Sequence, residues 1–119
     1  MSTTYTLYGI PNCNTVKKAM DWLNENQITF EFHNFKKSGV TNELINQWFD
    51  KFGVEKVINK SGLTFKKLSL EERNQLNSPA AISAYLIENT SAIKRPVLMK
   101  KNESLLIGFN EDDYQILLK

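Results

Sequence analysis

The sequence contains a single cysteine, Cys13, and a single histidine, His33. One cysteine cannot form a disulfide within the chain, so a disulfide-stapled fold is excluded. One cysteine and one histidine are also too few for a structural zinc site of the usual four-ligand kind. The fold must therefore rest on an apolar core, which a chain of 119 residues can supply without a metal or a disulfide.

Long apolar runs and a strong charge imbalance are also missing. No apolar run approaches the roughly 20 residues that cross a bilayer, and the net charge is only +2. A nucleic-acid-binding domain usually shows a concentrated basic face, and the first residues lack the basic and apolar segments of a secretory signal. We therefore expect a cytoplasmic protein that binds neither membrane nor nucleic acid. No exposed apolar face is evident from the pattern, so we expect a monomer.

The five glycines and three prolines do not gather into a linker, and no internal repeat is present. We therefore expect one domain over residues 1–119. Its first part alternates strand and helix: β-branched and aromatic residues predict a strand over 4–8, and alternating polarity predicts a strand over 28–33. Apolar residues spaced i, i+3, i+4 and i+7 predict a helix between these strands: Val16, Ala19, Met20 and Leu23.

The middle of the chain is predicted to be helical. An apolar stripe indicates a helix over 44–52 that ends at Gly53. Ser69 and Glu72 have the spacing of a capping box, and Ser78 followed by a proline starts a further helix, which runs to about Asn89 and buries Ile82, Tyr85 and Leu86.

Two short apolar runs, 97–99 and 105–107, predict a hairpin, and acidic residues after Asn110 predict a final helix. A strand–helix–strand opening favours a parallel pair, whereas the hairpin is antiparallel. We therefore predict an α/β fold: a small mixed four-stranded sheet with helices on both faces and a helical insertion in the middle. This order is typical of the thioredoxin fold.

Cys13 lies where the first predicted helix begins. It is three residues before Val16, so it could simply extend the apolar stripe as a buried side chain. The alternative is a reactive thiol, because unpaired N–H groups at a helix N-terminus favour an anion and lower a thiol pKa below the ~8.5 of a free cysteine. Lys17, one turn further on, can add positive charge on the same side.

Several segments resemble the arsenate reductase-like family (ArsC, Spx and YffB-type proteins) of the thioredoxin superfamily, and YffB-type proteins most of all. The segment 8–19, YGIPNCNTVKKA, resembles the active-site segment of that family. Further similarities lie, in the same order, at its middle loop, its Arg-Pro motif and its closing strand: 57–62, 65–68, 94–97 and 106–109. The resemblance covers nearly the whole chain.

The resemblance implies a role for each residue of a candidate site. Cys13 would be the catalytic nucleophile, Pro96 a structural cis-proline against it, and Arg95 a guanidinium pointing towards it. An arginine fork binds an oxyanion or a carboxylate at two points. We expect the other substrate-binding residues to be Asn12, Asn14, Thr15, Lys17 and Lys60.

The sequence departs from the family's arsenate reductases at the basic residues. Those enzymes place three arginines around the cysteine, and only Arg95 clearly matches. Lys60 and Ser61 stand at the middle-loop arginine, and 108–110, Gly-Phe-Asn, stands where the third would be. An Arg/Lys pocket can instead hold the carboxylates of glutathione, which is our favoured co-substrate; no bound cofactor and no metal are expected.

A second active-site cysteine is missing too, since Val16 stands three residues after Cys13. A mixed disulfide at Cys13 must then be resolved by a second molecule, such as glutathione, with glutaredoxin as a further partner. His33 is expected at the surface or as a cap rather than as a base. We predict a glutathione-dependent thiol reductase; the alternatives are a glutathione- and glutaredoxin-coupled arsenate reductase and a non-catalytic Spx-like regulator that binds another protein.

Overall fold

Four strands form one mixed sheet in the computed structural model, which describes residues 5–119. The strand order is β2 (Phe30–Asn34), β1 (Tyr5–Gly9), β3 (Val97–Lys100) and β4 (Glu103–Ile107). β1 is parallel to β2 and antiparallel to β3, and β3 pairs with β4 as a hairpin. The α/β class and the mixed four-stranded sheet are confirmed. Thr4, the first residue of the predicted 4–8 strand, lies outside the described residues.

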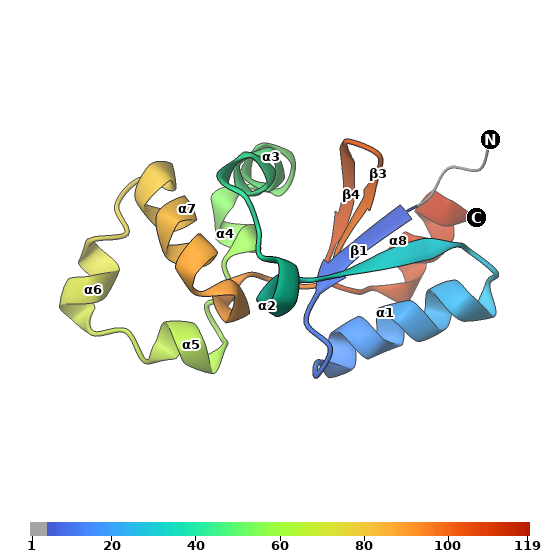
Figure 1. Ribbon diagram of the computed structural model, residues 1–119, viewed down its shortest axis with the longest axis horizontal. Coiled ribbons are helices and arrows are strands. Elements are labelled where there is room, and N and C mark those ends of the chain that lie inside the picture. The colour runs from blue at the N-terminus through green and yellow to red at the C-terminus, as the bar shows by residue number, and fades with distance from the viewer. Residues whose placement is uncertain (1–4) are drawn as a thin grey trace. The chain divides into compact units, whose positions relative to one another are not determined.

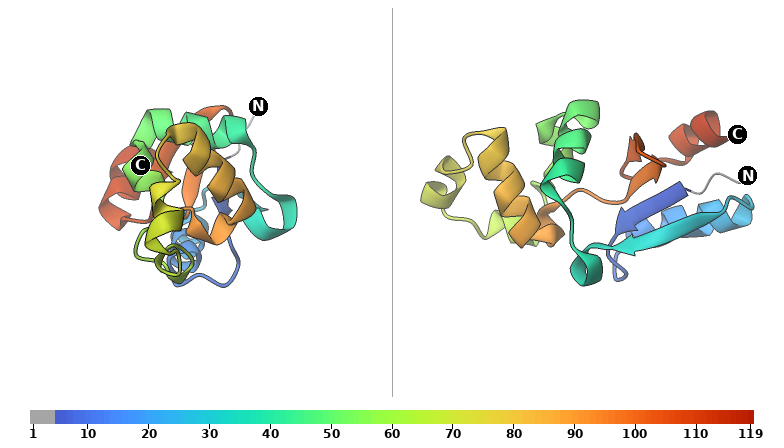
Figure 2. Two further views of the ribbon diagram at one scale, coloured as in Figure 1. Left: turned by 90° about the vertical axis from the view of Figure 1, so that its left-hand side faces the viewer. Right: turned by 45° about the horizontal axis from the view of Figure 1, so that its top comes forward.

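Two helices, α1 (Asn14–Glu25) and α8 (Glu111–Leu118), share one core with the two central strands. Leu7 of β1 lies opposite Leu98 of β3, and both are fully buried. They pack with the buried apolar face of α1, namely Val16, Ala19, Trp22 and Leu23, and with Tyr114 of α8. α1 runs along β1 and β2 in Figure 1 and in the right-hand view of Figure 2. The helix that follows Cys13 thus packs on the centre of the sheet.

The described chain falls into two compact units. The first contains residues 5–38 and Arg95–Lys119, and so holds the sheet, α1, α8 and the short helix α2 (Phe35–Ser38). The second, Gly39–Lys94, contains only helices: α3 (Asn42–Phe52), α4 (Val54–Val57), α5 (Leu63–Lys66), α6 (Leu70–Asn74), α7 (Pro79–Glu88) and the 3₁₀ turn η1 (Thr90–Ala92). The predicted helical middle of the chain therefore forms a unit of its own.

The second unit has a small core of its own. α3 packs against α7, and Ile45, Trp48 and Leu86 are fully buried. The hydroxyl of Ser83 on α7 donates a hydrogen bond to the Asn42 side chain at the start of α3. Backbone bonds join the end of α4 to the segment after α7: the Asn59 N–H donates to the Ala92 carbonyl, and the Lys94 N–H to the Val57 carbonyl, both at 2.7 Å.

Side-chain caps begin three helices where the sequence predicted them. Ser69 and Glu72 form a complete capping box on α6. The Ser78 hydroxyl accepts from the Ala81 N–H at the start of α7, and Asn110 caps α8. One prediction about burial was only partly right: Leu86 is buried, but Ile82 and Tyr85 are half-buried. In residues 5–119, no helix is both long and apolar enough to cross a membrane.

Candidate active site

The loop from β1 to α1 sets the position of Cys13. β1 ends at Gly9, whose backbone packs so closely on α1 that a Cβ there would lie 2.8 Å from Cγ2 of Val16. Ile10 is buried, whereas Pro11 and Asn12 are exposed, so the loop is anchored at one end and open at the other. Cys13 is the N-cap residue of α1, with extended backbone geometry (φ −134°, ψ 122°), and its side chain makes no ordinary capping hydrogen bond.

The pKa of Cys13 is lowered below the ordinary thiol value. Burial is the largest single influence and raises the pKa, because it disfavours the thiolate. The N–H of Val16, a hydrogen bond from the Arg95 side chain, the N–H of Thr15 and the charge of Arg95 all lower the pKa, and together they outweigh burial. The free N–H groups at the start of α1 thus act on the sulfur as an anion site.

Arg95 reaches Cys13 because of where β3 starts. Val97, the first residue of β3, pairs with Tyr8 near the end of β1, so the two residues before Val97 lie at the edge of the sheet from which the Cys13 loop departs. The Arg95–Pro96 peptide bond is cis, the geometry that the family resemblance implied. Pro96 is buried, and its carbonyl accepts a hydrogen bond from the Gly108 N–H at 2.8 Å. The buried Pro96 and its hydrogen bond to Gly108 hold the neighbouring Arg95 beside the Cys13 thiol.

The other predicted site residues divide between the two units. Asn12, Asn14 and Thr15 flank Cys13 with exposed side chains. Lys17 is exposed on α1, and its N–H donates to the Cys13 carbonyl at 3.0 Å. Among the described residues, the charge that lowers the Cys13 pKa is that of Arg95 and not of Lys17.

Lys60 belongs to the second unit, where its ammonium group forms an exposed ion pair with Glu55. A role for Lys60 in holding a substrate of Cys13 remains a prediction. The other arginine, Arg73, is also in that unit: it lies 5.0 Å from the Phe65 ring centre and donates to the carbonyls of Phe65 and Lys66. Arg73 therefore holds α6 to α5.

His33 packs in an aromatic cluster with Tyr8 and Phe35, its ring centre 4.7 Å from that of Tyr8. Residues 5–119 contain no group of three or more histidine, cysteine, aspartate or glutamate side chains that could hold a metal ion. The sequence predicted that the N–H groups at the helix start favour the thiolate, but it did not single out the N–H of Val16, a residue named for its place on the apolar stripe and for standing where a second cysteine would be. Its position three residues after the N-cap is the signal that could have found it.

A family model described as "ArsC family" matches residues 8–117 of this chain. An uncharacterized protein of Haemophilus influenzae is 38% identical over 110 residues, which are 92% of this chain and 95% of that protein. The global transcriptional regulator Spx of Streptococcus agalactiae is 32% identical over 115 residues, 95% of this chain and 82% of the regulator.

Solved structures show the same similarity. A protein named YFFB is 36% identical, with a TM-score of 0.89 over 97% of this chain and 99% of its own. An arsenate reductase (ArsC) related protein from Brucella melitensis is 33% identical, with a TM-score of 0.76 over 100% of this chain and 98% of its own. An arsenate reductase from Vibrio cholerae, at 16% identity and a TM-score of 0.77, shares the fold.

Proposed function

This chain belongs to the ArsC family, and from that premise we propose that it is a thiol reductase that uses Cys13 as its single nucleophile and glutathione as co-substrate. The observation that carries the proposal is the environment of the sulfur. Cys13 is the N-cap residue of α1, and the Val16 N–H, the Thr15 N–H and the Arg95 guanidinium all favour its thiolate. The thiolate is the form of cysteine that attacks disulfides.

The proposed reaction is a thiol–disulfide exchange in two steps. The Cys13 thiolate attacks one sulfur of a substrate disulfide R–S–S–R′; the S–S bond breaks, and R′–S⁻ leaves and takes up a proton. A glutathione thiolate then attacks the Cys13–S–S–R intermediate, which releases the Cys13 thiolate and forms a glutathione–R disulfide. Substrate R′ is reduced, glutathione supplies the electrons, and Cys13 returns to its starting state.

Glutathione enters the proposal because the chain cannot resolve the intermediate alone. Cys13 is its only cysteine, so no second thiol within the chain can attack the mixed disulfide. Arg95, fixed beside the sulfur, is suited to bind a carboxylate of the glutathione tripeptide through its planar fork. The Thr15 and Val16 N–H groups and Arg95, which lower the Cys13 pKa, favour the thiolate without a general base, and a thiolate attacks directly.

Reaction with oxidised glutathione, followed by intact-protein mass spectrometry, tests the proposal. We expect one glutathionyl group per chain, formed at neutral pH faster than on the same thiol in the urea-unfolded chain. The Cys13→Ser variant should form none. An adduct that forms no faster in the folded protein than in the unfolded chain would show that the fold does not activate Cys13, and the proposal would be wrong.

A second candidate function rests on the relatives named Spx, which match this chain over 95% of its length. By this alternative the protein binds a component of the transcription machinery, and Cys13 has no catalytic role. Immobilised wild-type protein and Cys13→Ser can be compared for retention of purified RNA polymerase. Our proposal expects no saturable retention by either; retention that survives the substitution would favour the regulator.

Arsenate reduction is the third possibility, since the Brucella melitensis protein described as related to an arsenate reductase is 33% identical. The chain has only two arginines, and Arg73 is held by Phe65 and Lys66. A single arginine beside the thiol gives an arsenate ion little charge compensation. We expect arsenate-dependent oxidation of NADPH, coupled through glutathione and glutaredoxin, to stay at the background rate.

A further inference from the structure

The turn between β4 and α8 begins with a glycine in an unusual backbone conformation. Gly108 is buried, and its φ of +74° lies in the left-handed region. Glycine adopts this region readily, whereas a residue with a Cβ adopts it at a cost in free energy. The backbone at this point therefore favours glycine, and the hydrogen bond that Gly108 makes gives a reason for the conformation.

The Gly108 N–H donates to the Pro96 carbonyl at 2.8 Å. In the β3–β4 hairpin Val97 lies opposite Ile107, so this bond continues the pairing by one residue towards Arg95. Pro96 is buried, and a buried carbonyl without a donor is unfavourable. Because proline has no N–H, its carbonyl is the one backbone group that it can offer to the sheet. Gly108 thus ties Pro96 to the end of the hairpin.

The turn that carries Gly108 is itself held at its two following residues. The Phe109 ring packs on Tyr114 of α8, with ring centres 4.8 Å apart, and Tyr114 is fully buried. The Asn110 side chain accepts a hydrogen bond from the Asp113 N–H at 3.1 Å and caps α8. The direction of the Gly108 N–H is therefore set by the packing of α8.

Arg95 lies between two residues whose backbones are hydrogen-bonded. The Lys94 N–H donates to the Val57 carbonyl at 2.7 Å, and the Pro96 carbonyl has the donor described above. The Arg95 side chain in turn makes a hydrogen bond to the Cys13 sulfur. Hydrogen bonds weaken steeply when their geometry is distorted, so a displaced Arg95 backbone would weaken the contact at the sulfur.

We propose that Gly108 is a positioning residue for the chemistry at Cys13, an inference that rests on the proposed reductase function. Its N–H holds the Pro96 carbonyl and, through it, keeps the Arg95 side chain on the sulfur. A residue with a Cβ at this position would relax φ out of the left-handed region and turn the N–H away from Pro96. The thiolate would then lose part of its hydrogen bond to the guanidinium.

Gly108→Ala tests the proposal in the reduced protein without glutathione. We expect the ratio of thiolate to thiol at pH 7, from a titration of thiolate absorbance, to fall about threefold or more, as for the loss of one hydrogen bond. Gly39→Ala is the matched control: its φ is +72°, and a Cβ there would meet nothing within 4 Å. It should lower the urea midpoint and leave the thiolate ratio unchanged. Equal falls in the thiolate ratio from both variants would mean that backbone strain alone is the cause, and the proposal would be wrong.

A double-mutant cycle shows whether Gly108 acts through Arg95. In the Arg95→Gln background the guanidinium that Gly108 positions is gone, so Gly108→Ala should cause no further fall in the thiolate ratio. If Gly108→Ala lowered the ratio by the same factor in both backgrounds, Gly108 would act on Cys13 by another route, and the proposal would be overturned.

The hydrogen bond can also be measured in the wild type, which does not depend on the folding of a variant. We expect a scalar coupling through the hydrogen bond between the Gly108 ¹⁵N and the Pro96 carbonyl ¹³C, and its absence would contradict the proposal. The thiolate ratio and the coupling do not involve glutathione. An unchanged thiolate ratio in Gly108→Ala would therefore overturn the role of Gly108 alone, whereas slow glutathionylation of the wild type would overturn the reductase function alone.

Discussion

Arg95 is the ionised side chain that lowers the pKa of Cys13 in the described part of the chain. Arg95→Gln removes this charge and leaves a side chain that is uncharged at every pH. We therefore expect the thiol pKa to rise, as followed by thiolate absorbance, and glutathionylation at pH 7 to slow roughly tenfold, the effect of losing one hydrogen bond to a charged group. Lys94→Gln, which removes an equal charge from the exposed neighbour, should leave both quantities unchanged. Equal effects from the two substitutions would contradict a direct role for Arg95.

Tyr114 carries a buried hydroxyl in the core of the first unit. It is fully buried between α8, Trp22 and Phe109, and its oxygen has no hydrogen-bond partner in residues 5–119. Removing an unpartnered buried hydroxyl relieves an unfavourable burial. We expect Tyr114→Phe to leave the free energy of unfolding unchanged or to raise it by up to about 1 kcal/mol.

Urea unfolding of Tyr114→Phe and Tyr114→Ala side by side checks this prediction. Tyr114→Ala also deletes the ring that packs on Trp22, and it should cost about 3 kcal/mol or more. If Tyr114→Phe were also destabilised by more than about 1 kcal/mol, the hydroxyl would have to make a hydrogen bond after all.

At the scale of the elements, β1 and α1 meet at Gly9 and Val16. A Cβ on Gly9 would lie 2.8 Å from Cγ2 of Val16, closer than carbon atoms pack, and 3.4 Å from its Cγ1, which is an ordinary contact. We expect Gly9→Ala to destabilise the protein by about 1–3 kcal/mol, as for other overpacked sites. It should also slow glutathionylation, because the displaced first turn of α1 carries the N–H groups that act on Cys13.

A double-mutant cycle shows whether this clash is the cause. Val16→Ala removes both methyl groups that the new Cβ would meet, so Gly9→Ala should cost less in the Val16→Ala background than in the wild type. Strictly additive costs in urea unfolding would mean that Gly9 is required for another reason.

Long elements were predictable because many residues repeat the same signal. The apolar stripe of α1 and the alternation in β2 each extend over several residues, and the caps at Ser69, Ser78 and Asn110 mark helix starts chemically. The four-residue helices α2, α4 and α5 were not predicted. One helical turn is too short for a 3.6-residue period to become visible, and tertiary contacts decide whether it forms.

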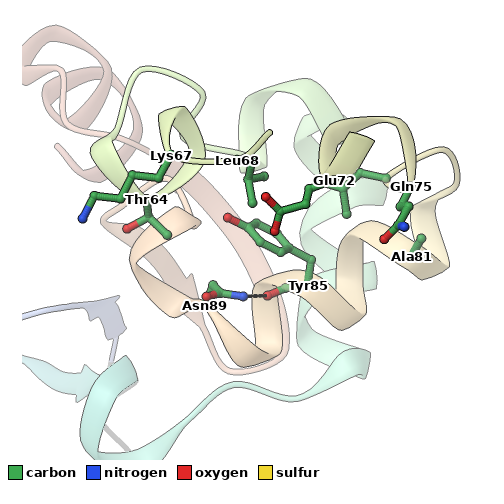
Figure 3. Close-up of a pocket in the computed structure, with 9 residues that line it drawn as sticks. Thr64, Lys67, Leu68, Glu72, Gln75, Ala81, Tyr85 and Asn89 are labelled. Carbon is green, nitrogen blue, oxygen red and sulfur yellow. Dashed lines mark hydrogen bonds between the residues drawn. The ribbon is translucent and has the colours of Figure 1, made fainter. Parts of the chain in front are cut away.

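The site was predictable at Cys13 and Arg95 for different reasons. The lowered pKa of a cysteine at a helix start follows from local electrostatics. The position of Arg95 depends instead on pairing between β1 and β3, which are far apart in sequence. That pairing came from the family resemblance and not from spacing. Tyr85 was expected in the core because Ile82, Tyr85 and Leu86 have the i, i+3, i+4 spacing of one helix face, and this spacing cannot show that the Tyr85 side chain lines a cavity (Figure 3).

For the molecule as a whole, the single cysteine ties redox state to folding stability. The N–H groups and the guanidinium that favour the Cys13 thiolate are assembled only in the folded state. They lower the folded-state pKa relative to that of the unfolded chain, so ionised Cys13 stabilises the fold. This contribution is fully present above the ordinary thiol pKa, and it is lost as the pH falls through the lowered pKa of the folded protein.

Capping the sulfur should therefore destabilise the protein, and only at higher pH. Methyl methanethiosulfonate converts Cys13 to a small methyl disulfide that cannot ionise. We expect the capped protein to melt at a lower Tm than the reduced protein at alkaline pH, and the difference to shrink as the pH is lowered. Any effect of the added bulk is independent of pH, so the low-pH difference measures it and can be subtracted. Cys13→Ser should show the same pH dependence of Tm as the capped protein, since neither carries a thiolate. A Tm difference that stays constant from acid to alkaline pH would mean that the fold does not favour the thiolate, and single-cysteine exchange chemistry would lose its physical basis.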